Sequence, residues 1–332
     1  MSGALLAAVM ARPEQAETLG PAAWNALIAA ARAEQMAGNL AARIAGVPVP
    51  PAAARVLADA LASAEQGRIA ALWEAEMARR ALAPIGVPVV LLKGTAFVAA
   101  GLAAGRGRSI GDLDILVPFD ALDAVETALI GGGWEWVKPE PYDDLYYRRW
   151  MHELPPLIHR TRDRMIDVHH TILPRTARPT PDACALLRDA VAIGRGLHML
   201  CPEDMLVHAA AHLFADGDLQ GGLRNLWDIH CLLEEYGGEG FEAGLLARAE
   251  LHGLRSAMAR ALRLRAAIFK EAGGLRGSDR LFRRRLLARD GWGRLRHKET
   301  ELGFYLRGHL LRMPPAMLAR HLWTKWRGGH RP

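Results

Sequence analysis

The sequence predicts an α+β protein in which a small mixed β-sheet is flanked by N-terminal and C-terminal helical regions. Residues 1–83 are rich in alanine and carry apolar residues at three- and four-residue spacing, which is typical of helices. From Pro84 the chain changes to short aliphatic and β-branched runs, which predict strands. Beyond Pro174 the helical spacing returns. We therefore expect a helical region over 1–83, an α/β core over 84–175 and a C-terminal helical domain over 176–332.

The same patterns predict the individual elements. The segment V-P-V-P at 47–50 divides the first region into two helices, because proline ends helices. The predicted helices of the first region and core cover 22–45, 51–82, 95–102 and 119–130. The predicted strands cover 89–92, 112–117, 134–137, 154–159 and 165–170, and 139–150 is expected to be an exposed loop or hairpin. The later helices are expected at 181–192, 202–215, 219–236, 241–252, 255–272 and 279–288.

The charge of the chain is uneven. The formal net charge is +6, yet residues 254–332 alone contain 20 Lys and Arg against 5 Asp and Glu. Such a basic segment indicates either a solvated face or a surface for an anionic partner such as nucleic acid, an acidic peptide or a membrane. In the tail at 307–331, Trp323 and Trp326 accompany the basic residues, so this piece is a candidate contact for RNA or anionic lipid.

The remaining composition favours a cytoplasmic protein. The three cysteines, Cys184, Cys201 and Cys231, are widely spaced and form no CxxC pair, which suits a reducing compartment. The N-terminus lacks a basic segment before its apolar residues, so we expect a first helix rather than a signal peptide. No run of 18 apolar residues predicts a transmembrane segment.

Three carboxylates are the strongest indication of chemistry. Asp112 and Asp114 are two residues apart on an apolar strand, so their side chains lie on the same face. Asp167 is in the middle of another apolar strand, and the three converge if the two strands are neighbours. Such anions need a cation, and oxygen ligands suit Mg²⁺ or Mn²⁺. The alternatives are capping acids for the pair and a salt bridge for Asp167.

Basic and small residues nearby form a candidate phosphate site. The segment Lys93-Gly94-Thr95 lies at a strand-to-helix turn, where Gly lets the backbone approach a phosphate and Lys or Thr binds its oxygens. Arg108 lies in the following Gly-rich loop with Arg106. It is expected either to clamp phosphate or to be a solvated loop charge. Lys93 has the alternative role of capping a strand end.

Several other polar residues are candidates for the wall of the same cleft. Alternation along the strand puts His169 on the face of Asp167, and His152-Glu153 is a further candidate. His208 and His212 are four residues apart on one helix, which is suitable spacing for metal ligands, but the H-E-x-x-H pattern of zinc proteases is absent. Arg224 and Asp228 share a face of the next helix. We favour polar residues lining the cleft over a second metal site for these helices.

These motifs resemble those of a known group. The order of a strand, a Gly-containing turn, a helix, an Asp-x-Asp strand and a later Asp strand resembles the nucleotidyltransferase superfamily that includes DNA polymerase beta. The pieces L-L-K-G-T, G-D-L-D-I-L-V, I-D-V-H-H, V-H-A-A-A-H-L and L-R-N-L-W-D-I-H resemble more closely the bacterial family of uncharacterised nucleotidyltransferases. The similarity spans about residues 82–233. It implies a nucleotidyltransferase core with Asp112, Asp114 and Asp167 as metal ligands, and with Gly94 and Thr95 in place of the Gly-Ser turn of the superfamily.

The function that this resemblance implies is metal-dependent transfer of a nucleoside monophosphate. The donor would be a nucleoside triphosphate such as ATP, pyrophosphate would leave, and Asp167 could take the proton of the acceptor. The acceptor is an unidentified small molecule, peptide or RNA. The alternative is a catalytically idle module that binds a nucleotide or peptide within a biosynthetic or regulatory assembly.

Overall fold

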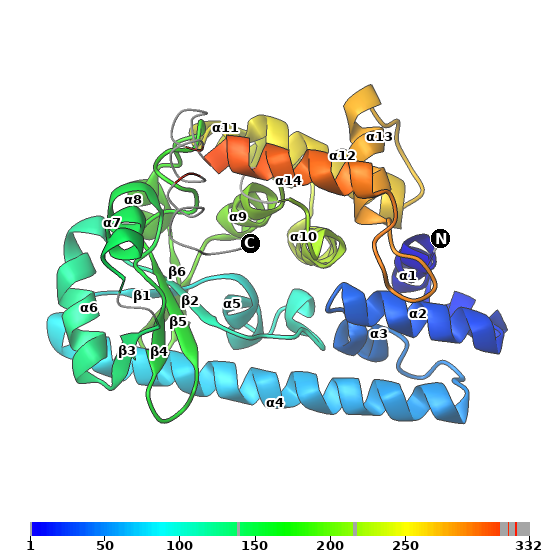
Figure 1. The fold of residues 1–332 in the computed structure, drawn as a ribbon, viewed down its shortest axis with the longest axis horizontal. Helices are drawn as coiled ribbons and strands as arrows, with labels where there is room; N and C mark the ends of the chain where they lie inside the picture. The colour runs from blue at the N-terminus through cyan, green and yellow to red at the C-terminus, as the bar shows by residue number, and fades with distance from the viewer. Residues whose placement is uncertain (1, 138–139, 215–217, 313–317, 319–322, 324–332) are drawn as a thin grey trace.

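The computed structural model of the chain describes residues 2–137, 140–214, 218–312, 318 and 323. It contains one mixed β-sheet with helices packed around it (Figure 1). The long helix α4 (Pro51–Leu82) runs along one side of the molecule, and the later helices lie on the opposite side (Figure 1). The predicted α+β class, with a mixed sheet between helical regions, is confirmed.

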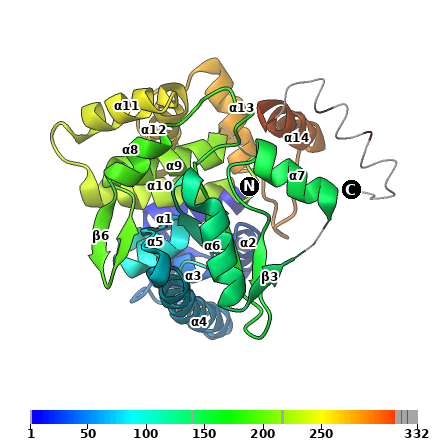
Figure 2. The same cartoon turned by 90° about the vertical axis from the view of Figure 1, so that its left-hand side faces the viewer.

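Within the described residues, seven strands form the sheet in the order β3-β4-β5-β2-β1-β7-β6. Strand β2 is antiparallel to β1 and parallel to β5, so the sheet is mixed. Strands β3 and β6 lie at opposite edges (Figure 2). The strands are β1 Val89–Leu91, β2 Leu113–Leu116, β3 Trp134–Trp136, β4 Leu157–His159, β5 Met165–His169, β6 Val191–Gly194 and β7 Leu197–Met199.

The two strands that carry the predicted carboxylates are neighbours. Every residue of β1 and β2 is buried, and apart from Asp114 all of them are aliphatic. The parallel pairing of β2 with β5 sets Asp114 beside Asp167. Because directly paired residues lie on the same face of a sheet, the register brings these two side chains together.

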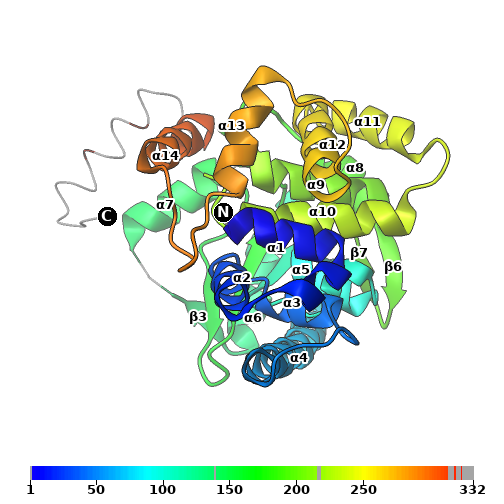
Figure 3. The ribbon, with the colours of Figure 1, turned by 90° about the vertical axis from the view of Figure 1, so that its right-hand side faces the viewer.

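The N-terminal helices are α1 Ser2–Ala11, α2 Pro21–Ala33, α3 Ala37–Arg43 and α4. The helix predicted over 22–45 is wrong in one respect, because the chain breaks it at Gln35, whose φ is 56°. The predicted helix over 51–82 is confirmed, and Pro51 begins it because its fixed φ suits the first turn. Helix α1 packs against α2 and α12, so it joins the two helical regions (Figure 3).

The loop or hairpin predicted over 139–150 is wrong, because Pro141–Trp150 forms helix α7. Its first turn begins with Pro141, and an ion pair from Asp144 to Arg148 connects successive turns. The rings of Tyr146 and Trp150 also contact each other, 5.7 Å apart between centroids. These local contacts explain a helix in a segment whose polar and aromatic composition indicated a loop.

The helix predicted over 181–192 is also wrong beyond its first half. Helix α8 covers only Ala183–Arg188, and β6 and β7 follow as a hairpin that extends the sheet next to β1. Residues Gly194, Arg195 and Gly196 all have positive φ, which closes the tight turn between the strands. The sheet therefore extends beyond residue 175.

The remaining elements follow the predicted order. The other core helices are α5 Lys93–Ala99 and α6 Leu122–Gly131, with 3₁₀ turns at η1 Pro13–Thr18, η2 Ala83–Ile85, η3 Ala103–Gly105 and η4 Phe119–Ala121. The later helices are α9 Pro202–Phe214, α10 Gly222–Tyr236, α11 Phe241–Leu251, α12 Arg255–Phe269, α13 Gly277–Leu286 and α14 Lys298–Arg312.

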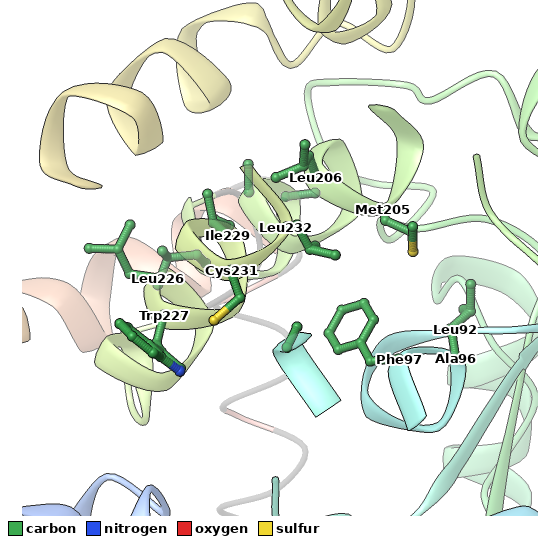
Figure 4. Close-up of a cluster of buried hydrophobic side chains, with 14 of the residues drawn as sticks. Leu92, Ala96, Phe97, Met205, Leu206, Leu226, Trp227, Ile229, Cys231 and Leu232 are labelled. Carbon is green, nitrogen blue, oxygen red and sulfur yellow. The ribbon is translucent and has the colours of Figure 1, made fainter. Parts of the chain in front are cut away.

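A buried apolar cluster fixes α9 and α10 opposite α5. Figure 4 shows Phe97 of α5 facing Met205 of α9 and Leu232 of α10, and all three side chains are buried. Burying each such side chain contributes roughly 1.5–3 kcal/mol. The polar residues on the facing sides of α9 and α10 are thereby held at the end of β1.

No helix among the described residues has the length and hydrophobicity needed to span a bilayer. The three cysteines are free. Most of the predicted basic tail, including Trp326, lies outside the described residues, whereas Trp323 is described and more than half exposed.

Candidate functional site

The site begins where β1 ends. Lys93 follows this buried strand with a φ of 48°, a left-handed backbone conformation that is unfavourable for residues other than glycine. Its ammonium group donates a hydrogen bond to Asp114 Oδ1 at 2.6 Å. This hydrogen bond directs the Lys93 side chain toward Asp114 on the neighbouring strand β2.

The three predicted carboxylates converge. Asp112, Asp114 and Asp167 each offer one oxygen, and these oxygens lie within 4.8 Å of one another. Asp114 is buried, Asp167 is half-buried and Asp112 is exposed. Three oxygen ligands open to solvent at one side fit a hard divalent cation such as Mg²⁺, which keeps several waters.

The two paired carboxylates differ in their electrostatic surroundings. Burial disfavours the charged form of Asp114, but Lys93 and the hydrogen bond from His169 outweigh this effect, so its pKa is lowered. Burial, together with the negative charges of Glu153 and Asp114, raises the pKa of Asp167 to about 7. The cluster therefore carries more negative charge than its neighbours neutralise, which also fits a bound cation.

His169 lies between two carboxylates. Its Nε2 donates to Asp114 Oδ1 at 2.9 Å, and its Nδ1 lies 3.4 Å from Glu153 Oε2. Burial disfavours the charged imidazolium, but the Asp114 hydrogen bond and Glu153 outweigh burial, so the pKa of His169 is raised. Glu153 and His152, which the sequence indicated only by their position before a strand, thus join the site.

Basic side chains from the loop before β2 and from α10 form another wall. The buried guanidinium of Arg108 lies 2.9 Å from Asp228 Oδ2. Arg224 lies one turn before Asp228 on α10 and donates to the side-chain oxygen of Gln35. In the described structure Nε of Arg108 and Nε of Arg224 have no hydrogen-bond partner. Each can donate to an additional anionic ligand.

Part of this set lines one cavity of about 550 Å³, whereas Asp167, His169 and Asp228 do not line it. The carboxylates of Asp112 and Asp114 line it together with the cationic groups of Lys93, Arg108 and Arg224. Gly94 also lines it, and Arg108 packs so closely that a Cβ at Gly94 would lie 3.3 Å from Arg108 Nε. The cavity therefore combines cation ligands with basic groups, the two features that a metal-bound phosphate requires.

Other predicted residues lie beside this cavity or beneath it. Thr95 is only 1% exposed and does not line the cavity. A second cavity of about 50 Å³ adjoins the first and shares Lys93, Arg108, His212 and Arg224 with it. His208, Asn225 and Asp228 line only this second cavity, together with apolar side chains. Burial and the nearby charge of Lys93 lower the pKa of His208 well below its usual range, so this imidazole is neutral.

Within the described part of the chain, His208 and His212 belong to no group of three potential metal ligands. Among the described residues, two groups of three or more potential ligands come together, one formed by the three aspartates and one by His152, Glu153 and His169. His212 instead contacts the side-chain amide of Asn225 at 3.3 Å. Both histidines line a cavity beside the carboxylate cluster.

Comparison with models of protein families matches residues 20–270 to a family described as uncharacterised nucleotidyltransferase. The match covers the whole sheet and all the predicted site residues. No curated protein matches the chain. Since the match extends over most of the sequence and the motifs of the resemblance lie within it, the chain belongs to this nucleotidyltransferase family.

Proposed function

We propose that the protein is a divalent-metal-dependent nucleotidyltransferase that moves a nucleoside monophosphate from a nucleoside triphosphate, such as ATP, to an acceptor and releases pyrophosphate. The observation that carries the proposal is the single cavity lined by Asp112 and Asp114 together with Lys93, Arg108 and Arg224. In the reaction the acceptor oxygen or nitrogen forms a bond to the α-phosphorus. The bond from this phosphorus to the bridging oxygen breaks, pyrophosphate leaves with the electron pair, and Asp167 would take the proton of the acceptor.

Asp112, Asp114 and Asp167 would hold the cation. A bound Mg²⁺ or Mn²⁺ would neutralise charge on the phosphate oxygens of the donor. The positions of Lys93 and His169, both hydrogen bonded to Asp114, favour this role because they fix the direction of its carboxylate.

Lys93, Arg108 and Arg224 would hold the phosphates of the donor. Arg108 is fixed by Asp228, so its guanidinium loses little freedom when a phosphate arrives. Arg224 lies half-buried beside Arg108, and the two like charges favour an anion between them or next to them. Gly94 has no side chain, so it leaves room for the guanidinium of Arg108 at this wall of the cavity. This steric role would require glycine here whether or not the start of α5 binds a phosphate.

The acceptor is a small molecule, a peptide or RNA, and the basic C-terminal segment favours an anionic one. The test is to incubate the full-length protein with each triphosphate, Mg²⁺ and candidate acceptors. Mass spectrometry should detect an acceptor that has gained the mass of a nucleoside monophosphate. Detection of pyrophosphate without and with EDTA tests the metal requirement. A protein that binds triphosphate in calorimetry but never modifies an acceptor or releases pyrophosphate would favour the idle binding module.

A further inference from the structure

A second group of potential ligands lies behind the carboxylate cluster. It consists of His152, Glu153 and His169, and their ligand atoms lie within 4.8 Å of one another. Backbone pairing holds the two segments together, because Glu153 bridges His169 and the amide of His170 donates to the carbonyl of His152 at 2.9 Å. The group is therefore positioned before any ligand arrives.

The hydrogen bonds of His169 leave one nitrogen available. Its Nε2 donates to Asp114, so Nδ1 is the ring nitrogen that faces Glu153. Among the described residues Nδ1 has no hydrogen-bond partner although the side chain is 2% exposed, and Glu153 Oε2 is 3.4 Å away. A buried lone pair and a carboxylate oxygen facing each other repel unless a proton or a metal ion lies between them.

The third member approaches the same oxygen. Nε2 of His152 lies 3.8 Å from Glu153 Oε2, and the rings of His152 and His169 are 5.2 Å apart between centroids. His152 is 9% exposed, and its Nδ1 also lacks a hydrogen-bond partner in the described structure. Two imidazoles and one carboxylate thus meet at one point.

This set of atoms differs in chemistry from the oxygen-only group beside it. Two imidazole nitrogens and one carboxylate, with a fourth position for water, are typical ligands of zinc and related ions. The carboxylate of Asp114 hydrogen bonded to the far nitrogen of His169 is the usual support of a metal-binding histidine. We propose that His152, Glu153 and His169 bind a zinc-type divalent ion, connected through His169 to Asp114.

Cobalt uptake tests this inference. The full-length protein is stripped with a chelator and titrated with Co²⁺ in excess Mg²⁺, and the visible absorption of Co²⁺ bound to nitrogen ligands is followed. The wild-type chain should bind one equivalent, and Glu153→Gln or His152→Ala should weaken the affinity by more than about tenfold. His198→Ala, which removes a histidine of β7 outside the group, should bind like the wild type.

Glu153→Gln is nearly isosteric, so its far-ultraviolet circular dichroism spectrum should match that of the wild type. A change in its Co²⁺ affinity is then due to the lost carboxylate rather than to unfolding. Equal Co²⁺ affinity in Glu153→Gln, His152→Ala and the wild type would overturn the inference. So would loss of the Co²⁺ signal in a double Asp112→Asn, Asp167→Asn variant that keeps all three proposed ligands. In either case His169 is an imidazolium between two carboxylates.

The outcome is separable from the proposed function. A protein that transfers nucleotides but binds no Co²⁺ at these residues overturns the inference alone. Co²⁺ bound at these residues in a protein without transferase activity overturns the proposed function alone.

Discussion

Asp114 is the residue through which the parts of the site are connected. It accepts hydrogen bonds from Lys93 and His169 and is paired in the sheet with Asp167. Its position on an apolar strand two residues after Asp112 could be predicted from sequence, because alternation along a strand is a local property. The His169–Glu153 contact could not, since it depends on how the segment before β4 folds back on β5.

Replacing Asp112 and Asp114 separately distinguishes a role in the reaction from a role in the fold. Asp112→Asn should abolish transfer while changing the free energy of unfolding by less than about 0.5 kcal/mol, because its side chain is exposed. Asp114→Asn should abolish transfer and also cost about 3 kcal/mol, because it leaves Lys93 and His169 without their buried anion. Urea denaturation and an assay of both variants provide the comparison. Equal stability of the two would contradict the connecting role of Asp114.

At the scale of elements, close backbone contact between α3 and the loop before β2 positions Arg108. A Cβ added at Gly38 of α3 would overlap the carbonyl oxygen of Gly107, and Gly107 itself has a φ of 64°. The side chain of Asn39 donates to the carbonyl of Arg106 at 2.9 Å in the same contact. Helix α3 thus supports the loop from which Arg108 reaches the cavity.

Gly38→Ala should therefore push this loop away from α3. We expect a loss of about 1–3 kcal/mol in stability and a higher KM for the triphosphate, because Arg108 is displaced. Gly244→Ala, at an exposed position in helix α11, is the matched control, since the added methyl meets no neighbouring element and should stabilise the protein by about 0.5–1 kcal/mol. Thermal melting and initial rates measure both effects. An unchanged KM in a destabilised Gly38→Ala protein would show that the contact between α3 and the loop does not position Arg108 for the triphosphate.

Another connection between elements depends on a buried carboxylate. Asp204 of α9 is fully buried and accepts hydrogen bonds from Arg248 at 2.7 Å and from His252 at 3.0 Å. Arg248 also donates to Asp189 at the end of α8. Burial disfavours the charged carboxylate, but these two donors outweigh burial and lower the pKa of Asp204.

The stability that Asp204 contributes should therefore depend on pH. A lowered folded-state pKa stabilises the protein above the unfolded-state value of about 3.9, and this stabilisation is lost as the pH falls further toward the folded-state pKa. Asp204→Asn should lower the urea midpoint at pH 7 and at pH 5, and the difference from the wild type should shrink below pH 4. A difference that is constant from pH 7 to pH 3 would show that the charge of Asp204 is irrelevant.

The elements also show which local patterns determine structure. The strands and helices of residues 89–130 could be predicted because each has a continuous apolar run or a helical period. Helix α7 was missed because its stabilising contacts are an ion pair and a pair of rings within a polar segment. The β6–β7 hairpin was missed because it is short, and its pairing with β1 depends on residues about 100 positions earlier in the chain.

At the scale of the whole molecule, the site forms where the three predicted regions meet. Gln35 comes from the N-terminal helices, the aspartates come from the sheet, and Arg224 and Asp228 come from α10. The pairing of Arg108 with Asp228 could not be predicted because it joins elements 120 residues apart through tertiary packing alone. We propose that the regions 1–83, 84–175 and 176–332 are organised around this cavity rather than around separate sites.

The most direct test of the central claim is transfer of an α-phosphate label. The full-length protein is incubated with an α-labelled triphosphate, Mg²⁺ and the acceptor found by mass spectrometry, alongside Asp112→Asn. We expect labelled acceptor and an equal amount of pyrophosphate with the wild type, and neither product with Asp112→Asn or in EDTA. Undiminished label transfer by Asp112→Asn, or equal transfer with and without divalent metal, would contradict it.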